Sequence, residues 1–131
     1  MENNRNIVSH LKSNFAEVDG HKMFLDSKDS LGLSSEGIYE PFETELVKEE
    51  LKKGDVVLDI GANIGYYTLI FAKLVGEQGK VFAFEPEPSN FYLLKKNVEI
   101  NGYKNVTSIQ MAVSNKTGKL KLYLSEVNKG D

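Results

Sequence analysis

The sequence of 131 residues contains no cysteine. This absence excludes disulfide bonds, thiolate zinc sites and cysteine nucleophiles, and it suits a reducing compartment. Long apolar runs are also missing, because the longest, residues 69–75, is short and is interrupted by Lys73. The first 15 residues lack the apolar core of a signal peptide. We therefore expect a cytoplasmic protein.

Charge of one sign does not accumulate anywhere along the chain. The formal net charge is −3, and lysine and arginine are interspersed with the acidic residues. Such a balance predicts neither a nucleic-acid partner nor a membrane partner. Hydrophobic residues make up 40% and charged residues 27%, which is typical of a soluble globular domain. The length allows one domain, and we expect no metal site.

The N-terminal third shows weaker patterns than the rest. Apolar residues at helical spacing predict a short amphipathic helix over residues 5–16, and residues 22–26 could form a short strand. Residues 27–37, rich in serine and glycine, are typical of a loop. A helix should open at Glu40-Pro41 and end before Gly54. Its buried stripe is predicted to consist of Phe42, Leu46, Val47 and Leu51.

From residue 56 onward the pattern alternates between strands and helices. We predict strands over 56–60, 80–85 and 106–113, with the first buried on both faces as a parallel strand requires. The intervening helices cover 65–75 and the segment from Pro88 to Gly102. Alternating leucines at 120, 122 and 124 predict a final antiparallel strand. The fold class is therefore α/β and doubly wound, with spatial strand order 3-2-1 and ligands beyond the carboxyl ends of the strands.

A glycine loop follows the first of these strands, at Asp59-Ile60-Gly61-Ala62-Asn63-Ile64-Gly65. The two glycines allow a sharp turn and close approach of a ligand, and Asn63 tolerates a left-handed conformation. The next helix would point its free N–H groups at the loop. The segment could also be a plain tight connection. The dinucleotide pattern Gly-x-Gly-x-x-Gly is broken at Asn63 and Tyr66, and the Gly-Lys-Ser/Thr ending of a Walker loop is absent.

Glu85 ends the second predicted strand. A carboxylate at this place can accept hydrogen bonds from both ribose hydroxyls of an adenosine, and it would repel a 2′-phosphate. Alone, Glu85 could equally be a solvated residue at the end of a strand. Pro86 and Pro88 direct the next helix. We expect Glu87 to be exposed and to have no special role.

Taken together, these motifs resemble the FkbM-type methyltransferases, a branch of the class I fold that uses S-adenosylmethionine (SAM). The matching segments are Tyr39-Glu40-Pro41, the stretch from Asp59 to Thr68, Phe84-Glu85-Pro86-Glu87-Pro88, Asn97 with Asn101-Gly102, and Ala112-Val113-Ser114. The resemblance runs from about Gly37 to the end of the chain. It implies that the glycine loop holds the methionine part of SAM, that Glu85 holds the ribose and that Ala112-Val113 borders the adenine.

The resemblance implies a set of cofactor-binding residues, consisting of Asp59, Gly61, Ala62, Asn63, Gly65, Tyr66, Thr68, Glu85, Pro86, Ala112 and Val113. It also places Glu40 near the amino group of the cofactor, although Glu40 could equally serve the electrostatics of the helix start. No catalytic residue is assigned. We expect His10 and His21, the two histidines, to lie on the surface rather than to act as bases.

Compared with the FkbM-type pattern, the later strands are absent. We therefore expect residues 1–131 to form one incomplete domain, with a lead-in over 1–38 and a SAM-binding half over 39–131. The edge of the first parallel strand would be left open and apolar, which favours self-association.

The leading functional hypothesis is the cofactor half of an O-methyltransferase for a sugar-like or other small hydroxyl acceptor. A truncated, non-catalytic interaction module is the alternative. A fragment of an NAD-dependent oxidoreductase is less favoured.

Overall fold

The computed structural model describes residues 15–124. The elements follow the order β1 (Phe15–Val18), β2 (His21–Phe24), α2 (Leu33–Glu36), α3 (Pro41–Glu50), β3 (Val56–Ile60), α4 (Tyr66–Val75), β4 (Lys80–Phe84), α5 (Pro88–Ile100) and β5 (Val106–Ile109). The predicted strands and helices between 56 and 102 are confirmed within a residue or two at their ends. Within residues 15–124, no helix has the length and apolarity needed to cross a membrane.

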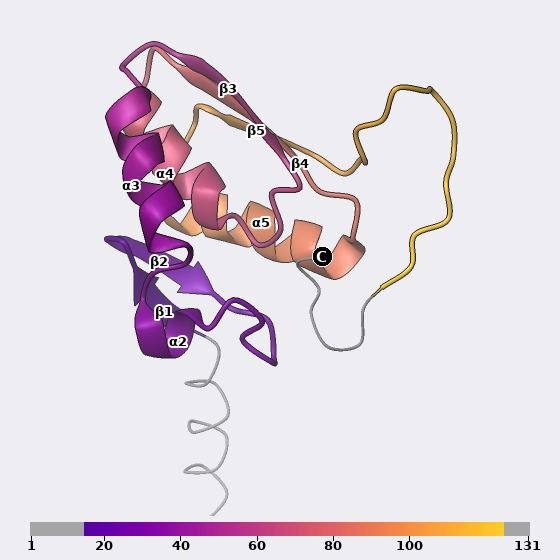
Figure 1. Ribbon diagram of the computed structural model, residues 1–131, viewed down its shortest axis with the longest axis horizontal. Helices are drawn as coiled ribbons and strands as arrows, with labels where there is room; N and C mark the ends of the chain where they lie inside the picture. Colours follow the sequence, from indigo (N-terminus) through magenta and orange to yellow (C-terminus); the bar gives the residue numbers. More distant parts are fainter. Residues whose placement is uncertain (1–14, 125–131) are drawn as a thin grey trace, which may run out of the picture.

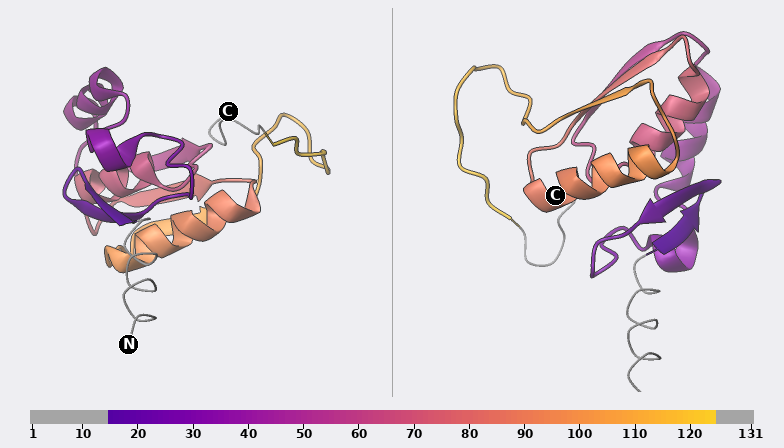
Figure 2. Two further views of the ribbon diagram at one scale, coloured as in Figure 1. Left: turned by 90° about the horizontal axis from the view of Figure 1, so that it is seen from below. Right: turned by 180° about the vertical axis from the view of Figure 1, so that it is seen from behind.

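Strands β3, β4 and β5 form a parallel sheet in the order β3-β4-β5. Leu58 lies opposite Phe82, and Phe82 lies opposite Thr107. Helices α4 and α5 lie on the same side of this sheet, as Figure 1 and the view from behind in Figure 2 show. The predicted strand order and the α/β class are therefore confirmed.

The core lies between the sheet and these two helices. Val81 and Ala83 of β4 are fully buried against α4 and α5, which contribute Leu69, Val75 and Leu94. Side chains alternate between the two faces of a strand, so the same alternation turns the other residues of the sheet away from the helices.

The opposite face of the sheet is open along β3. Val56, Leu58 and Ile60 are 67%, 62% and 60% exposed, so the prediction that this strand is buried on both faces is wrong. The physical reason is that a parallel sheet needs a layer on each face, and among residues 15–124 helices cover only one. Strand β3 also pairs only with β4 among the described residues, which agrees with the expected open edge.

A β-hairpin precedes the sheet, and the sequence prediction missed it. Strands β1 and β2 are antiparallel and are joined by Asp19-Gly20, with φ values of 48° and 78°. Two successive residues with positive φ form the hairpin turn for which Asp-Gly is a strong signal. Residues 15 and 16 belong to β1, so the predicted helix is wrong there, and its remainder lies outside the described residues. The short strand predicted over 22–26 is confirmed by β2.

Two side-chain amides, from Asn97 of α5 and from Asn101 at the C-terminal end of this helix, hold the hairpin in place. Asn97 Oδ1 accepts from the N–H of Phe24 at 2.7 Å, and Asn97 Nδ2 donates to the Phe24 carbonyl at 3.0 Å. One turn later, Asn101 forms the same pair of contacts with Lys22, at 3.0 and 2.8 Å. The spacing of four residues places both amides on one face of the helix, where they bond the backbone of β2 as a neighbouring strand would.

The segment predicted as a loop over 27–37 contains the short helix α2. The Asp29 carboxylate accepts hydrogen bonds from the N–H groups of Leu33 and Ser34, both at 2.9 Å. Leu33 is 1% exposed and packs in the core with Met23 of the hairpin. This burial and these hydrogen bonds stabilise a helical turn that the serine and glycine content does not predict.

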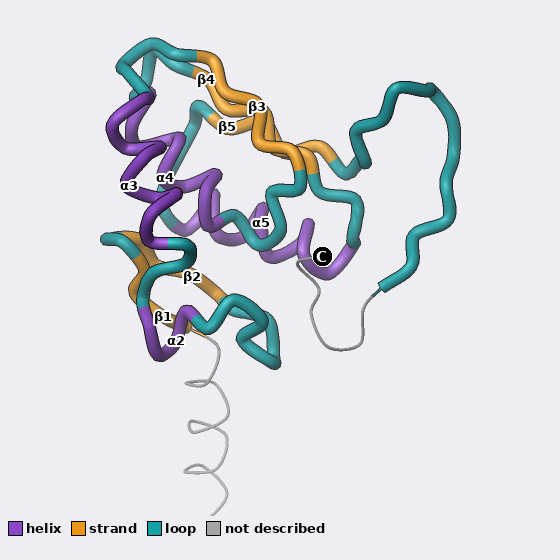
Figure 3. Tube along the Cα trace, in the orientation of Figure 1, coloured by secondary structure: helices purple, strands orange, loops and turns teal. Residues whose placement is uncertain are grey.

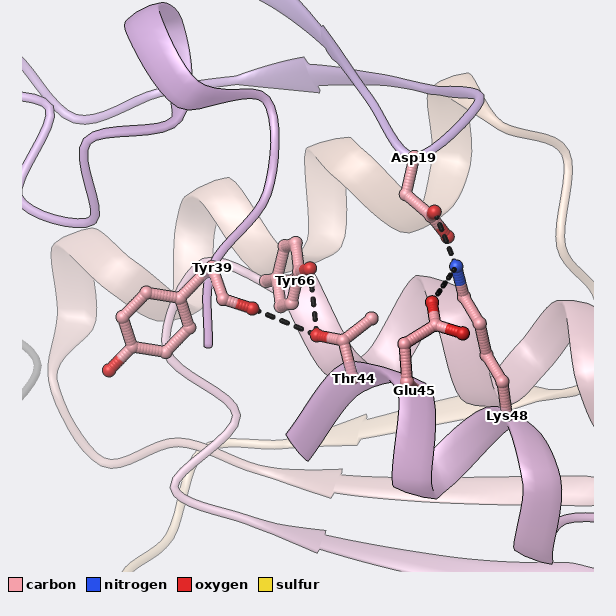
Figure 4. Close-up of polar contacts among 6 residues, drawn as sticks. All are labelled: Asp19, Tyr39, Thr44, Glu45, Lys48 and Tyr66. Carbon is pink, nitrogen blue, oxygen red and sulfur yellow. Dashed lines mark hydrogen bonds and ion pairs between the residues drawn. The ribbon is translucent and has the colours of Figure 1, made fainter. Parts of the chain in front are cut away.

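Helix α3 packs differently from the prediction. Phe42 and Leu46 are 77% and 48% exposed, so the predicted apolar stripe is wrong for them. The buried residue of its first turns is Thr44, whose hydroxyl donates to the Tyr39 carbonyl at 2.8 Å and lies 3.0 Å from the Tyr66 hydroxyl (Figure 4).

An ion pair fastens the other end of α3 to the hairpin. The Lys48 ammonium lies 2.8 Å from Asp19 Oδ1 and 3.5 Å from Glu45 Oε1 (Figure 4). Helix α3 is thus held by these polar contacts and by Val47, which packs against the core.

After Ile109 the chain leaves the sheet. Figure 3 draws the segment that follows β5 as a long loop extending away from the body. Leu120 and Leu122 are 85% and 47% exposed in it. The predicted antiparallel strand over 120–124 is therefore wrong, because no described strand lies beside it to supply ladder hydrogen bonds. For the same reason β5 ends four residues earlier than predicted.

Candidate functional site

The carboxyl ends of β3 and β4 bring two predicted segments together. The glycine loop follows β3, and Glu85-Pro86-Glu87 follows β4. The N–H groups of Gly61 and Ala62 both donate to the Phe84 carbonyl, each at 2.9 Å. The loop is therefore tied to the last residue of the neighbouring strand at the edge where a sheet of this kind binds ligands.

The glycine loop has the backbone conformation that its sequence predicts. Asn63 lies in the left-handed region with a φ of 52°, and Gly61 has a φ of 78°. Gly65 has a φ of 101°, and a Cβ atom there would lie 3.0 Å from Leu94 Cδ1. Gly65 is the residue immediately before α4, and a residue with a side chain there would have a strained backbone and would crowd Leu94 of α5.

Glu85 is the centre of the polar contacts at this edge. It is 6% exposed, and its Oε2 accepts from the Asn63 N–H at 2.8 Å while Oε1 accepts from the Glu87 N–H at 2.9 Å. Each carboxylate oxygen has a second lone pair, so both oxygens keep acceptor capacity for a ligand. Glu85 thus orients the loop and remains able to bind a pair of hydroxyl groups.

Asp59 is the second buried acid of the site. It is 8% exposed, and Asp59 Oδ2 accepts from the Thr68 hydroxyl at 2.5 Å. Burial raises the pKa of Asp59, the charge of Glu85 raises it further and the Thr68 hydrogen bond lowers it. Among the ion pairs of residues 15–124, none involves Asp59 or Glu85. Two neighbouring buried carboxylates without a cation favour a ligand that carries positive charge.

The other predicted site residues are arranged around these two acids. Thr68 is fully buried and contacts Asp59, and Pro86 is half-buried between Glu85 and Glu87. The side chain of Tyr66 is 3% exposed and faces Thr44 of α3, so a ligand at the loop would meet the backbone of this residue.

Ala112 and Val113 lie in the exposed segment after β5. The Glu85 N–H donates to the Ile109 carbonyl at 3.1 Å, which ties the end of β5 to the acidic segment. Ala112 and Val113 thus follow the third strand at the edge where Asp59 and Glu85 lie, with Val113 50% exposed.

Glu87 was predicted to be exposed and without a role, and this is wrong. It is 5% exposed, and its Oε2 accepts from the Asn90 N–H at 2.7 Å, which caps α5. The signal that could have found it is its place directly before Pro88, because proline favours the first helical position and an acidic side chain the position before it.

The expectation that both histidines lie on the surface is wrong for His21. It is 4% exposed, and its Nε2 lies 2.5 Å from the Tyr103 hydroxyl, at the amino end of the parallel sheet and away from Asp59. Burial and the charge of Lys73 lower the pKa of His21, while Asp19 raises it. His10 lies outside the described residues.

Comparisons with known proteins give the site its context. Residues 19–122 match the TRM5/TYW2 methyltransferase domain family. A protein-L-isoaspartate O-methyltransferase of Methanococcoides burtonii is 38% identical over 60 residues, which are 46% of this chain and 30% of that protein. A solved protein-L-isoaspartate O-methyltransferase superimposes with a TM-score of 0.53 at 32% identity, over 57% of this chain and 24% of that chain.

The crystal structure of TYW2 from M. jannaschii, in complex with AdoMet, which is SAM, superimposes with a TM-score of 0.60 at 27% identity. The alignment covers 72% of this chain and 41% of that one. The present chain therefore spans less than half the length of the proteins with which it was matched. Because the family match extends over most of the sequence and the solved relatives share its parallel sheet, the chain belongs to the class I SAM-dependent methyltransferases, with the TRM5/TYW2 methyltransferase domain as the matching family.

Proposed function

We propose that this chain binds SAM at the carboxyl ends of β3, β4 and β5, and that residues 39–131 are the cofactor-binding half of a methyltransferase, with residues 1–38 as a lead-in. The observation that carries the proposal is the pair of buried acids, Asp59 and Glu85, without a cation in the described part of the chain. SAM carries a sulfonium and an ammonium group, so its charge suits these carboxylates.

The roles of the residues follow from their positions. Glu85 would accept hydrogen bonds from the two ribose hydroxyls, because backbone N–H groups hold both of its carboxylate oxygens in place. The backbone of the loop from Gly61 to Gly65 would carry the methionine part, and Asp59 would stabilise the loop and the positive charge beside it. Ala112 and Val113 would border the adenine, and Pro86 would shape the ribose end of the pocket.

We further propose that the acceptor atom is oxygen. Support comes from the relatives named as O-methyltransferases, which act on protein L-isoaspartate. A sugar-like hydroxyl acceptor and membership of the FkbM-type branch rest on the sequence motifs from Tyr39 to Ser114. SAM supplies a methyl group that its sulfonium already activates. The described residues of this chain would bind and orient the donor and exclude water from it.

The test of cofactor binding is a thermal-melt titration with S-adenosylhomocysteine, with NAD as the control ligand. A ligand that binds only the folded chain should add about 2.7 kcal/mol of stability at 100 times its dissociation constant. We expect a saturable shift with S-adenosylhomocysteine alone, and a much smaller one in Glu85→Gln. A shift with NAD alone, or with neither ligand in a chain that melts cooperatively, would contradict the proposal.

The acceptor is tested separately with methyl-labelled SAM. We expect label to enter an oxygen acceptor, and the two substrates to compare are an L-isoaspartyl peptide and a monosaccharide. Label found only on nitrogen or carbon atoms of an acceptor would contradict an oxygen acceptor while leaving cofactor binding intact.

The open face of the sheet supports a second candidate, an interaction module. Val56, Leu58 and Ile60 form an exposed apolar stripe on an edge strand, and such surfaces usually mark association sites. We propose that copies of this chain self-associate through this stripe. Association and cofactor binding do not exclude one another, because the stripe and the two acids are parts of different surfaces.

A further inference from the structure

A cavity of about 520 Å³ lies at the end of the parallel sheet that is opposite to Asp59 and Glu85. Its walls come from the end of α4, from the loop that leads into β4 and from the loop between α5 and β5. Lys80 begins β4 and Asn105 directly precedes β5, so the cavity lies beside the amino ends of these strands. Its volume is within the range of sites that bind small molecules.

Asn105 contributes a fixed acceptor to the wall of the cavity. Its Nδ2 donates to the carbonyls of Ala72 and Gly76, at 2.9 and 2.8 Å, and these two bonds determine how the amide is oriented. Its Oδ1 is buried and has no hydrogen-bond partner among residues 15–124. A buried acceptor without a partner is costly, so this wall favours a ligand that donates a hydrogen bond to it.

Lysines give the lining of the cavity a positive charge. Lys73, Lys80 and Lys104 line it, and Glu77 is the one acidic residue beside them. None of these four side chains belongs to an ion pair within the described residues. The positive field extends to the hairpin, because burial lowers the pKa of His21 and the charge of Lys73 lowers it further. An anionic group suits a lining of this charge.

The lysines of the cavity are not needed to cap α4. The last carbonyls of a helix carry partial negative charge, which basic side chains often neutralise. Here the Lys73 carbonyl accepts from Lys53 Nζ at 3.1 Å. The Val75 carbonyl accepts from the Gly54 N–H at 2.8 Å. Within residues 15–124 the ammonium groups that line the cavity make neither of these bonds, so they remain available to a ligand.

We propose that this cavity binds a small anion that also carries hydroxyl groups, of the class of the sugar phosphates. Its phosphate would lie among Lys73, Lys80 and Lys104, and one of its hydroxyl groups would donate to Asn105 Oδ1. The proposal goes beyond cofactor binding and does not rest on it, because no residue that lines the cavity belongs to the SAM site proposed above.

The test compares three probes. Ribose 5-phosphate carries both groups, methyl phosphate carries the phosphate without the sugar hydroxyls, and ribose carries the hydroxyls without the phosphate. Two-dimensional NMR titrations follow the backbone amides of Gly79 and Gly102, which line the cavity. We expect ribose 5-phosphate to shift these signals saturably and to bind about tenfold or more tightly than either of the other probes.

Two double variants test the charged part of the site. Lys80→Gln combined with Lys104→Gln should weaken ribose 5-phosphate about tenfold, as for the loss of two contacts of exposed charges. Both lysines are exposed, so this variant should keep its fold. Lys95→Gln combined with Lys119→Gln removes the same charge away from the cavity, and it should leave the affinity unchanged.

The outcomes separate this site from the proposed function. Equal losses of affinity in the two double variants would overturn the site, because the probe would then respond to overall charge. Equal affinities for methyl phosphate and ribose 5-phosphate would overturn the role of Asn105. Titrations that leave Gly79 and Gly102 unshifted would overturn the whole proposal. A chain that binds ribose 5-phosphate in the cavity but not S-adenosylhomocysteine would support this site and refute the proposed function.

Discussion

Asp59 shows how one residue can oppose stability and favour binding. The burial that raises its pKa makes its charged form costly in the free chain. A cationic ligand would offset this cost, because an opposite charge nearby favours the ionised carboxylate. The same residue would therefore couple protonation to ligand binding.

We predict that Asp59→Asn separates these two effects. The folded chain holds the proton of Asp59 more tightly than the unfolded chain. The stability that Asp59 contributes is therefore fully present below the ordinary pKa of 3.8 and is lost as the pH rises through the raised pKa of the folded state. At pH 7 the variant should be at least as stable as the original chain, yet bind S-adenosylhomocysteine about tenfold or more weakly.

Melting curves between pH 4 and 7, combined with titrations at pH 7, would check this prediction. Asp55→Asn, at the opposite end of β3, serves as the control and should leave affinity unchanged. A variant that loses stability at pH 7 but binds normally would argue against the role of Asp59.

His21 predicts a second pH dependence with the opposite sign. Its lowered pKa means that the folded chain binds the proton less readily than the unfolded chain. Stability is then fully present above the ordinary pKa of 6.5 and is lost as the pH falls through the lowered pKa of the folded state. His21→Gln should flatten the fall in melting temperature between pH 7 and pH 5. The same slope in both proteins would show that other groups cause the acid sensitivity.

Some of these residues could be predicted from the sequence and others could not. The left-handed conformation of Asn63 was predictable, because the glycine loop requires a sharp turn and asparagine tolerates a positive φ. The burial of His21 was not, since it depends on Tyr103, which the fold brings from a distant part of the sequence.

At the scale of elements, one buried side chain of α5 bonds both the hairpin and the glycine loop. Asn97 is fully buried, and besides its two bonds to Phe24 its Nδ2 donates to the Ile64 carbonyl at 2.8 Å. Both donors and the acceptor of this amide are used. Helix α5 therefore holds the hairpin and the glycine loop with a single group.

We predict that Asn97→Ala destabilises the chain by about 3 kcal/mol, since three hydrogen bonds at about 1 kcal/mol each are lost. Urea unfolding followed by circular dichroism measures the change. Asn101→Ala is the comparison, because its bonds to Lys22 are exposed and should contribute about 1 kcal/mol or less. Equal losses of unfolding free energy in the two variants would mean that burial does not increase the contribution of the Asn97 hydrogen bonds.

Element boundaries were predictable where local signals end them. Gly76 ends α4, and Pro88 begins α5. The end of β5 was not predictable in this way, because pairing with β4 stops at Phe84 opposite Ile109. Asp19-Gly20 is a hairpin signal, but the prediction missed the hairpin, because the helical spacing of the preceding apolar residues favoured a helix over residues 5–16.

At the scale of the whole molecule, the described residues 15–124 cover one side of the sheet and leave the other open. Leu58 lies in the middle of the open stripe and is 62% exposed. Burial of apolar surface of this kind lowers the free energy, whichever molecule or segment covers it.

We predict that Leu58→Lys reduces self-association, because it places a charge in the centre of the stripe. Sedimentation velocity over a range of protein concentrations measures the effect. Leu46→Lys is the control: Leu46 is also exposed, but it lies on α3, so association should stay as in the original chain. A chain that is monomeric at all concentrations without substitution would rule out this surface as a self-association site.

The hydrogen bonds by which Asn97 joins the hairpin to the glycine loop also affect how these two segments open. When the hairpin detaches from α5, the amide that satisfies the Ile64 carbonyl loses its anchor at Phe24, so the glycine loop should loosen in the same opening event. Hairpin and loop would then exchange their amide hydrogens as one cooperative unit, although they are distant in sequence. A ligand on the loop would slow exchange in strands that it never touches.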